Sequence, residues 1–276
     1  MPVVRLVPTL SRPPWGGFRL GAELGKGEGS IGESWEVWRE NRVIGDSARL
    51  GDRVDFPLLV KLLDTRALLS VQVHPADVDA RLRAGAPHGK AEAWVVLAAE
   101  PGARIAYGLS RELTEAELRE RAGSGAIEAD LAWIEPQPGD VIDVPPGTIH
   151  AIGPGLLLYE VQEPIDLTWR LYDWGRGREL HLDHACAVAI RAPQPSPYRA
   201  SVAVAPGIDR LLETRHFVVD RVQLPARRRG WEAITVIEGS AHVEGHTVPR
   251  GGTVLVPPEG ALLEGEGVVL AARPGA

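Results

Sequence analysis

Cysteine is nearly absent from this chain, which has Cys186 alone among its 276 residues. An intramolecular disulfide and a cysteine-cluster metal site are therefore both excluded, and a metal ion would need histidine and carboxylate ligands. Because Cys186 lies in an Ala-rich stretch, we expect it to be a small buried apolar residue.

Lysine is scarce as well. Only Lys26, Lys61 and Lys90 contribute to the 30 basic residues, and the sequence contains one asparagine and one methionine. Heat adaptation depletes Asn, Cys and Met, and a GC-rich genome replaces Lys with Arg. A lysine is a compact charge whose pKa can be lowered enough for proton exchange, whereas an arginine stays charged. The three remaining lysines therefore mark candidate positions at which arginine cannot substitute.

Long apolar runs and an excess of positive charge are also missing. No apolar segment approaches the length of a membrane span, and the first residues lack the layout of a signal peptide. The net charge of -7 argues against a nucleic-acid partner bound through a general basic field. We therefore expect a globular protein of the cytoplasm, a monomer or weak homo-oligomer, whose partner is a small molecule and neither a membrane nor a nucleic acid.

Short apolar or alternating runs bounded by Gly and Pro dominate the chain from Phe56 onward. With 31 glycines and 23 prolines for turns, the pattern predicts a mainly β protein, a sandwich or barrel of short antiparallel strands. The predicted strands are 58–63, 68–73, 93–97, 105–107, 132–134, 140–144, 156–161 and 168–172. Two short helices are predicted as insertions, one at 75–84 that stops at Gly85, and one at about 111–123 that opens with a capping box at Thr114.

The segment 191–197 (RAPQPSP) can continue neither a helix nor a central strand, so it predicts a boundary between domains 1–190 and 198–276. The two domains share an internal echo, because 139–150 and 251–262 both show a glycine turn, an alternating strand and a proline-rich turn. This echo suggests two β-barrel units of one kind. Only the first copy ends in a histidine, His150, whereas Leu262 takes that place in the second.

The segment 139–150 matches the second cupin motif, Gly-x5-Pro-x-Gly-x2-His, at every fixed position. In place of the first cupin motif the chain has Gln72 and His74, which alternate onto one face of a strand, followed by Glu92. One amide oxygen, two imidazoles and one carboxylate suit Zn²⁺ or another divalent ion. Glu92 follows His74 at several times the usual spacing, and the predicted helix and its loop account for the excess.

Together with these motifs, a series of blocks resembles the type I mannose-6-phosphate isomerases (phosphomannose isomerases), in their short bacterial form, within the cupin superfamily. The resemblance runs in order from Trp15 to about His181. Its blocks are 15–17 (WGG), 32–36 (GESWE), 56–64 (FPLLVKLLD), 69–75 (LSVQVHP), 89–94 (GKAEAW), 146–152 (PGTIHAI), 160–163 (EVQE) and 168–173 (TWRLYD).

The resemblance implies two cupin-type β-barrel or jelly-roll units, with a catalytic metal-binding domain at 1–190 and a degenerate cupin-like domain at 198–276. It implies one Zn²⁺ per chain, with other divalent ions as alternatives, and interconversion of mannose 6-phosphate and fructose 6-phosphate through a cis-enediol. The residues it assigns are zinc ligands Gln72, His74, Glu92 and His150, phosphate contacts Lys61 and Ser70, the charge-stabilising Arg170, and Lys90 beside the metal-binding glutamate.

Three alternatives stay open at this point. Lys90, with a pKa lowered by the metal and Arg170, and a metal-bound water are rival groups for the proton transfer. A non-haem iron cupin enzyme could use the same ligands, although Lys61, Ser70 and Lys90 favour a phosphate-bearing substrate. A non-catalytic sugar-phosphate sensor is the third reading, which Arg170 and Lys90 disfavour.

Overall fold

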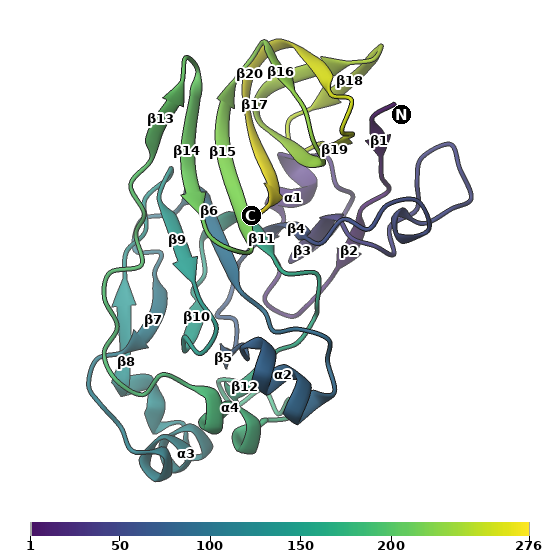
Figure 1. Ribbon diagram of the computed structural model, residues 1–276. Helices are drawn as coiled ribbons and strands as arrows, with labels where there is room; N and C mark the ends of the chain where they lie inside the picture. The colour runs from purple at the N-terminus through teal and green to yellow at the C-terminus, as the bar shows by residue number, and fades with distance from the viewer. Residues whose placement is uncertain (1, 276) are drawn as a thin grey trace. The chain divides into compact units, whose positions relative to one another are not determined.

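The computed structural model describes residues 2–275 and is mainly β, as predicted from the sequence (Figure 1). The strands are β1 (Val4–Arg5), β2 (Thr9–Ser11), β3 (Glu33–Val37), β4 (Leu59–Asp64), β5 (Val71–Val73), β6 (Glu92–Ala99), β7 (Ile105–Leu109), β8 (Leu131–Ile134), β9 (Val141–Val144), β10 (His150–Ile152), β11 (Leu156–Gln162), β12 (Trp169–Tyr172), β13 (Val202–Ala205), β14 (Ile208–Glu213), β15 (Phe217–Gln223), β16 (Ala226–Arg228), β17 (Glu232–Val243), β18 (His246–Pro249), β19 (Thr253–Val256) and β20 (Ala261–Pro274). The helices are α1 (Arg19–Ala22), α2 (Asp77–Ala84), α3 (Glu115–Ser124) and α4 (Leu182–Val188), with single 3-10 turns at Leu50–Asp52 and Ala126–Asp130. Across residues 2–275, no helix is both long and apolar enough to cross a membrane.

The chain packs into two compact units. Unit 1 consists of Met1–Asp64, Leu158–Pro164 and Arg199–Ala276, and unit 2 consists of Thr65–Leu157 and Ile165–Tyr198. The chain returns to unit 1 directly after the proline-rich segment 191–197. The division into domains 1–190 and 198–276 stays a prediction. The two compact units divide the chain differently, because the first 64 residues pack in the same unit as the C-terminal region.

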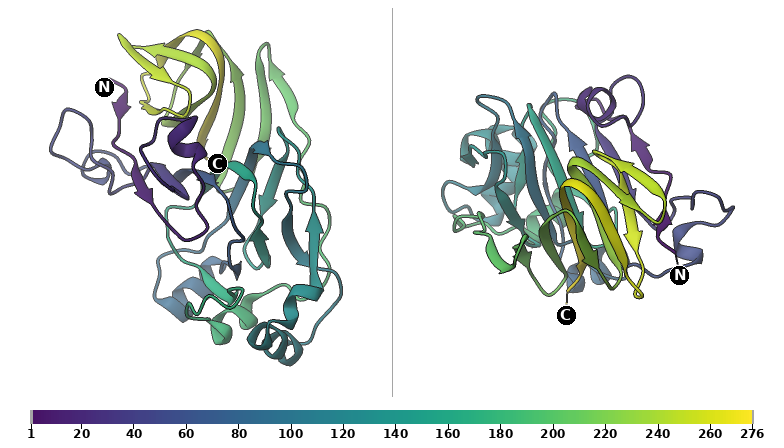
Figure 2. Two further views of the ribbon diagram at one scale, coloured as in Figure 1. Left: turned by 180° about the vertical axis from the view of Figure 1, so that it is seen from behind. Right: turned by 90° about the horizontal axis from the view of Figure 1, so that it is seen from above.

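A nine-stranded antiparallel sheet forms most of unit 1, in the order β1-β19-β17-β20-β15-β14-β13, with β16 and β18 paired to β20 and β17 (Figures 1 and 2). Strand β1 pairs with β19 through Val4 and Leu255, nearly the whole chain apart in sequence. One face carries an apolar core that includes Val222, Ile234 and Ala271. Strands β2, β3, β4 and β11 form a second sheet segment of this unit.

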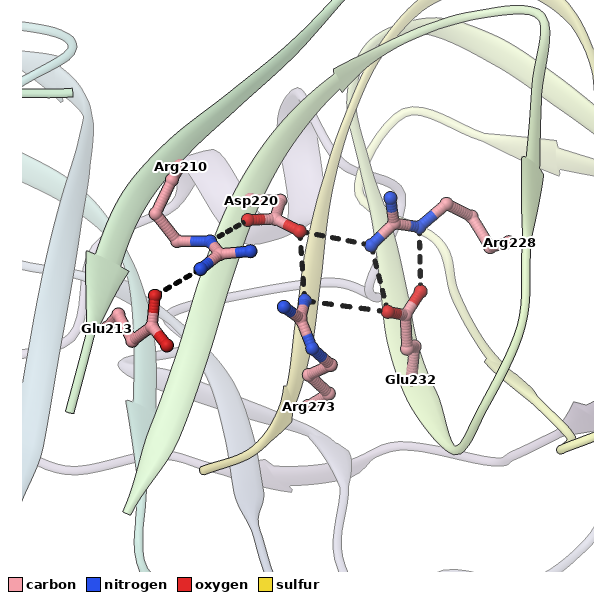
Figure 3. A network of polar contacts seen from close by, with 6 residues as sticks. All are labelled: Arg210, Glu213, Asp220, Arg228, Glu232 and Arg273. Atoms are coloured by element: carbon pink, nitrogen blue, oxygen red, sulfur yellow. Dashed lines mark hydrogen bonds and ion pairs between the residues drawn. The ribbon is translucent and has the colours of Figure 1, made fainter. Parts of the chain in front are cut away.

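The core-facing side of the large sheet also carries a charged network (Figure 3). Asp220 accepts hydrogen bonds from Arg210, from Arg228 at 3.1 Å and from Arg273 at 2.9 Å. Glu232 receives a two-pronged bond from Arg228, at 2.7 and 2.8 Å. Since both carboxylates are buried, this pairing with arginine is what makes their burial tolerable.

A five-stranded antiparallel sheet forms the centre of unit 2, in the order β12-β5-β10-β7-β8, and β6 pairs with β9. Helices α3 and α4 lie next to each other and pack on β12 (Figure 1). The apolar core between these helices and the sheet includes Leu118 of α3 and Val73 of β5. Cys186 is fully buried in this core, as expected from the sequence.

The predicted helices and strands of unit 2 are present, with ends that differ from the expected ones by at most four residues. Helix α2 ends at Gly85, whose φ of 62° is left-handed, and α3 opens with the reciprocal Thr114 and Glu117 capping box. Helix α4 was not predicted from the sequence. Its N-cap residue, His181, makes no side-chain cap bond, so the segment lacks the usual signal of a helix start.

Candidate metal centre

Strict alternation divides the side chains of the central unit 2 sheet between two faces. Val71, Val73, Ile149, Ala151, Trp169 and Leu171 all belong to the apolar core beneath α3 and α4. The residues between them, Gln72, His150 and Arg170, therefore point to the opposite face. Gln72 is the cross-strand partner of both His150 on β10 and Arg170 on β12, so these three side chains form a row across the sheet.

Ser70 and His74 join this face because they stand two residues to either side of Gln72. Ser70 Oγ donates a hydrogen bond to Gln72 Oε1 over 3.1 Å. The amide nitrogen of Gln72 in turn lies 3.1 Å from His150 Nε2. For Gln72 to offer its oxygen to a metal ion, the amide group would have to be turned over, an assignment that follows from the hydrogen-bond network alone.

Gly89 closes the long loop between His74 and Glu92. A Cβ atom at this position would stand 2.3 Å from the carbonyl oxygen of Pro75 and 2.6 Å from the carbonyl carbon of Ala76. The backbones of the two segments can approach this closely only because Gly89 has no side chain, and Lys90 N–H then donates to Pro75 O over 3.0 Å. The crossing brings Lys90 and Glu92 next to His74 despite their separation in sequence.

A turn at Gly147 positions the side chain of His150. Gly147 has φ +86° and donates its N–H to His74 O over 2.8 Å, which joins the turn before β10 to the end of β5. His150 Nδ1 lies 3.0 Å from the carbonyl oxygen of Thr148. This local bond orients the ring so that Nε2 faces away from the turn.

Glu92 lies at the centre of the cluster. Its Oε1 is 3.3 Å from His150 Nε2, and its Oε2 is 3.4 Å from His74 Nε2 and 2.7 Å from Lys90 Nζ. His74, Glu92 and His150 are all buried, and they could hold one ion because their ligand atoms lie within 4.8 Å of one another.

The protonation pattern of the two histidines fits a cation at this point. His74 Nδ1 lies 2.9 Å from Leu167 O, and His150 Nδ1 faces Thr148 O, so each Nδ1 carries the proton and donates it to a carbonyl. The lone pairs of both Nε2 atoms are then turned toward the Glu92 carboxylate, where the Lys90 ammonium supplies one positive charge and a metal ion would bind all three groups at once. Within the described chain, both Glu92 oxygens are buried and accept no hydrogen bond, although the Lys90 ammonium is close.

Burial keeps these groups in the state that a metal ion requires. Burial and the nearby charge of Lys90 lower the pKa of His74 to about 4, and burial also lowers the pKa of His150, so both imidazoles are neutral at pH 7. Burial alone would raise the pKa of Glu92, but Lys90 and the two histidines outweigh it and leave that pKa well below its usual range. A neutral pair of imidazoles beside an ionised carboxylate is a divalent-metal donor set.

Each of the three lysines forms an ion pair with a glutamate. Lys90 pairs with Glu92 at 2.7 Å, Lys26 with Glu36 at 2.7 Å, and Lys61 with Glu160 at 3.1 Å. All three lysine side chains are at most 8% exposed. The scarcity of lysine in the sequence therefore did single out positions where a largely buried ammonium group faces a carboxylate.

The structure thus brings together six of the eight predicted site residues: Ser70, Gln72, His74, Lys90, Glu92 and His150. Arg170 follows on the same sheet face as the partner of Gln72. Lys61 belongs to unit 1, where its ammonium lies 4.8 Å from the centre of the Trp35 ring as well as beside Glu160.

Several residues of this site were not predicted from the sequence. The carbonyl groups of Leu167 and Thr148 orient the two histidines, and His181 contacts the backbone of Arg170. Backbone acceptors leave no signal in residue types. For His181 a signal was available, because the resemblance to the isomerase family extends to about this residue.

A mainly β chain in which two neutral buried imidazoles at one sheet face meet an ionised carboxylate from a neighbouring strand defines a cupin-type protein with a candidate divalent-metal centre. No family model matches the chain. It is 35% identical over 223 residues to the mannose-6-phosphate isomerase ManA of Bacillus subtilis, a match that covers 75% of this chain and 69% of that protein. At this identity and coverage, the chain belongs to the mannose-6-phosphate isomerase family.

Solved structures agree in fold. The crystal structure of the mannose 6-phosphate isomerase from Bacillus subtilis aligns with a TM-score of 0.87 and 27% identity, over 99% of this chain and all of that chain. A mannose 6-phosphate isomerase solved with zinc bound aligns with a TM-score of 0.79 and 14% identity, over the full length of both chains, which shows a shared fold. The predicted cupin-type fold with short helices is therefore confirmed.

Proposed function

We propose that this protein is a zinc-dependent aldose-ketose isomerase that interconverts mannose 6-phosphate and fructose 6-phosphate. The observation that carries the proposal is the pair of buried imidazoles whose Nε2 atoms face the two oxygens of Glu92, in a chain of the mannose-6-phosphate isomerase family. Other family members are named for this reaction, and their zinc-bound relative shares the fold.

His74, Glu92 and His150 would hold the zinc ion, with Gln72 as a fourth ligand after rotation of its amide group. A bound zinc ion would supply Lewis-acid polarisation of the substrate carbonyl and stabilise negative charge on its oxygen. The two carbonyl acceptors behind the histidines keep their rings from rotating, which preorganises the donor set.

The isomerisation moves one proton between C2 and C1 of the sugar, while a hydroxyl proton passes between the two neighbouring oxygens. Lys90 is our candidate for carrying the carbon-bound proton, which it would accept as the neutral amine and return as the ammonium, because its Nζ lies 3.2 Å from His74 Nε2 at the edge of the ligand set. Arg170 would stabilise the charge of the cis-enediolate without titrating. Its Nε is buried and, among residues 2–275, has no hydrogen-bond acceptor, so this donor is available to substrate.

Lys61 and Ser70 are proposed as contacts of the substrate phosphate. A buried ammonium and a hydroxyl donor are chemically suited to a phosphate group that stays unchanged during the reaction. Binding energy gained there would position C1 and C2, which is a proximity effect. The proposed cytoplasmic location and monomeric or weakly oligomeric state rest on the sequence, and the net charge of -7 supports the absence of a nucleic-acid partner.

The test is turnover by zinc-loaded protein started from each side of the reaction. We expect mannose 6-phosphate and fructose 6-phosphate to reach the same final ratio, with no oxygen consumed. Equilibrium binding of both sugar phosphates without turnover would instead support the sensor reading. Oxygen uptake that requires Fe²⁺ would support the iron enzyme.

A further inference from the structure

Arg170 lies on β12, at one edge of the unit 2 sheet, and His181 bonds its outward-facing backbone groups. Strand β12 pairs with β5 on one side, and no strand in the described residues pairs with its other side. The Arg170 N–H donates to the ring nitrogen Nδ1 of His181 over 3.0 Å, and the Arg170 carbonyl accepts from the His181 N–H over 2.8 Å. One residue therefore satisfies both backbone groups of Arg170.

The same segment holds the guanidinium group. Arg170 Nη1 donates to the carbonyl oxygen of Glu179 over 2.8 Å. His181 is also the first residue before α4, and its carbonyl accepts from Ala185 over 2.8 Å, so the segment is itself anchored to a helix that packs on the sheet core. Arg170 is thus held at its backbone and at its far end by residues 179–181.

The direction of these backbone hydrogen bonds also determines which kind of cross-strand pair Arg170 forms with Gln72. In an antiparallel pair the N–H and C=O of a residue point to the same side of the strand. Those of Arg170 point outward to His181, so Arg170 and Gln72 form a non-hydrogen-bonded pair, the kind in which opposed side chains lie closest, with Cα atoms about 4.5 Å apart. His181 therefore stabilises the register that places Arg170 beside Gln72.

We infer that His181 is a positioning residue, which holds Arg170 on the metal-bearing face through an unprotonated Nδ1. This inference rests on the proposed function, in which Arg170 stabilises the enediolate. The Nδ1 atom accepts the Arg170 N–H, so the proton of the neutral ring is on Nε2. Burial and the charge of Arg170 lower the pKa of His181, which favours this neutral form. Loss of the acceptor leaves one backbone N–H at the sheet edge without its partner and lets the strand shift.

Three substitutions separate the acceptor from the rest of the ring. In His181→Asn the amide oxygen can take the place of Nδ1, in His181→Gln the amide lies at the position of the ring's far nitrogen, and His181→Ala removes both. The helix-start bonds through the His181 backbone survive in all three. His184→Ala is the matched control, because His184 lies in the first turn of α4, three residues after His181, but stacks on Trp169 and is bonded to no group of Arg170.

The experiment measures kcat and KM for mannose 6-phosphate, the zinc content and the melting temperature of each variant. We expect His181→Ala and His181→Gln to lose on the order of 10- to 100-fold in kcat, as a misplaced catalytic group does, with zinc content and KM close to wild type. His181→Asn is expected to recover kcat to within a few fold, and His184→Ala to keep it.

Wild-type kcat in His181→Ala, or an Asn variant as slow as the Gln variant while both remain folded, would overturn the inference alone. If His181→Ala does not fold, the comparison of Asn with Gln decides. A wild-type protein without turnover would overturn the proposed function first, and this inference with it.

Discussion

Gly89 offers the sharpest mutational test of how the site is assembled. In Gly89→Ala the new Cβ would meet the carbonyl oxygen of Pro75 at 2.3 Å and the nitrogen of Asp77 at 2.8 Å, and both are backbone atoms that cannot rotate away. The two segments must separate by about 1 Å, and overpacking of this kind costs about 1–3 kcal/mol of folding stability. Because Lys90 and Glu92 follow directly, the same displacement should lower kcat by roughly 100-fold.

Gly85→Ala is the control for this change. Gly85 has a left-handed φ of +62°, and a Cβ there meets nothing within 4 Å, so alanine costs about 1 kcal/mol through backbone strain without moving the site. Steady-state kinetics, zinc content and thermal melting of the two variants should show similar losses of stability but a kcat loss in Gly89→Ala alone. A Gly89→Ala variant with wild-type kcat would refute the idea that the close backbone approach at Gly89 determines the geometry of the site.

Two further predictions concern a strained tryptophan and the charged network of unit 1. Trp174 has a left-handed φ of 53° and donates its indole N–H to Leu69 O over 2.6 Å, one residue before Ser70. Trp174→Phe removes this hydrogen bond and should raise KM for mannose 6-phosphate several fold, while kcat stays within twofold. An unchanged KM would contradict the link between Trp174 and the phosphate contact. Asp220→Asn should cost about 1.5–3 kcal/mol in a denaturant titration, because it removes a buried carboxylate that accepts hydrogen bonds from three arginines, which then keep only their pairing with Glu213 and Glu232. Burial raises the pKa of Asp220, but hydrogen bonds from arginines outweigh it and hold the pKa below its usual range, so wild-type stability should be full above about pH 4 and fall as pH drops through the lowered pKa. The Asn variant should lose this acid-dependent component, and equal acid sensitivity of the two proteins would count against the network.

The proximity of the candidate metal ligands was predictable because local rules determine much of it. Alternation places Gln72 and His74 on one strand face, and a glycine turn followed by a short strand sets His150, both of which can be read from neighbouring residues. Glu92 was assigned in spite of its unusual spacing. The helix behind that spacing was predicted and is present as α2, whereas the backbone contact of Gly89 with Pro75 and Ala76 could not be inferred from residue types.

Non-local pairing explains the features that were missed. The N-terminal strands of unit 1 are two to five residues long and complete sheets whose other strands lie far along the chain, as β1 does with β19, so they carry little pattern of their own. The sequence echo aligned Leu262 with His150, yet Leu262 is 42% exposed, whereas Ala261 and Leu263 are buried. A register change of one residue moves a side chain to the other face of a strand, which motif alignment cannot detect.

The most direct test of the account is the metal dependence of isomerisation. Chelator-treated protein would be assayed for mannose 6-phosphate turnover with and without added Zn²⁺, beside His150→Ala and the control His242→Ala, which alters an exposed histidine of unit 1. We predict that turnover is absent after chelation, returns with zinc in the wild type and in His242→Ala, and stays absent in His150→Ala. Turnover that survives chelation, or that His150→Ala retains at the wild-type rate, would contradict the assignment of the metal centre as the site of the reaction.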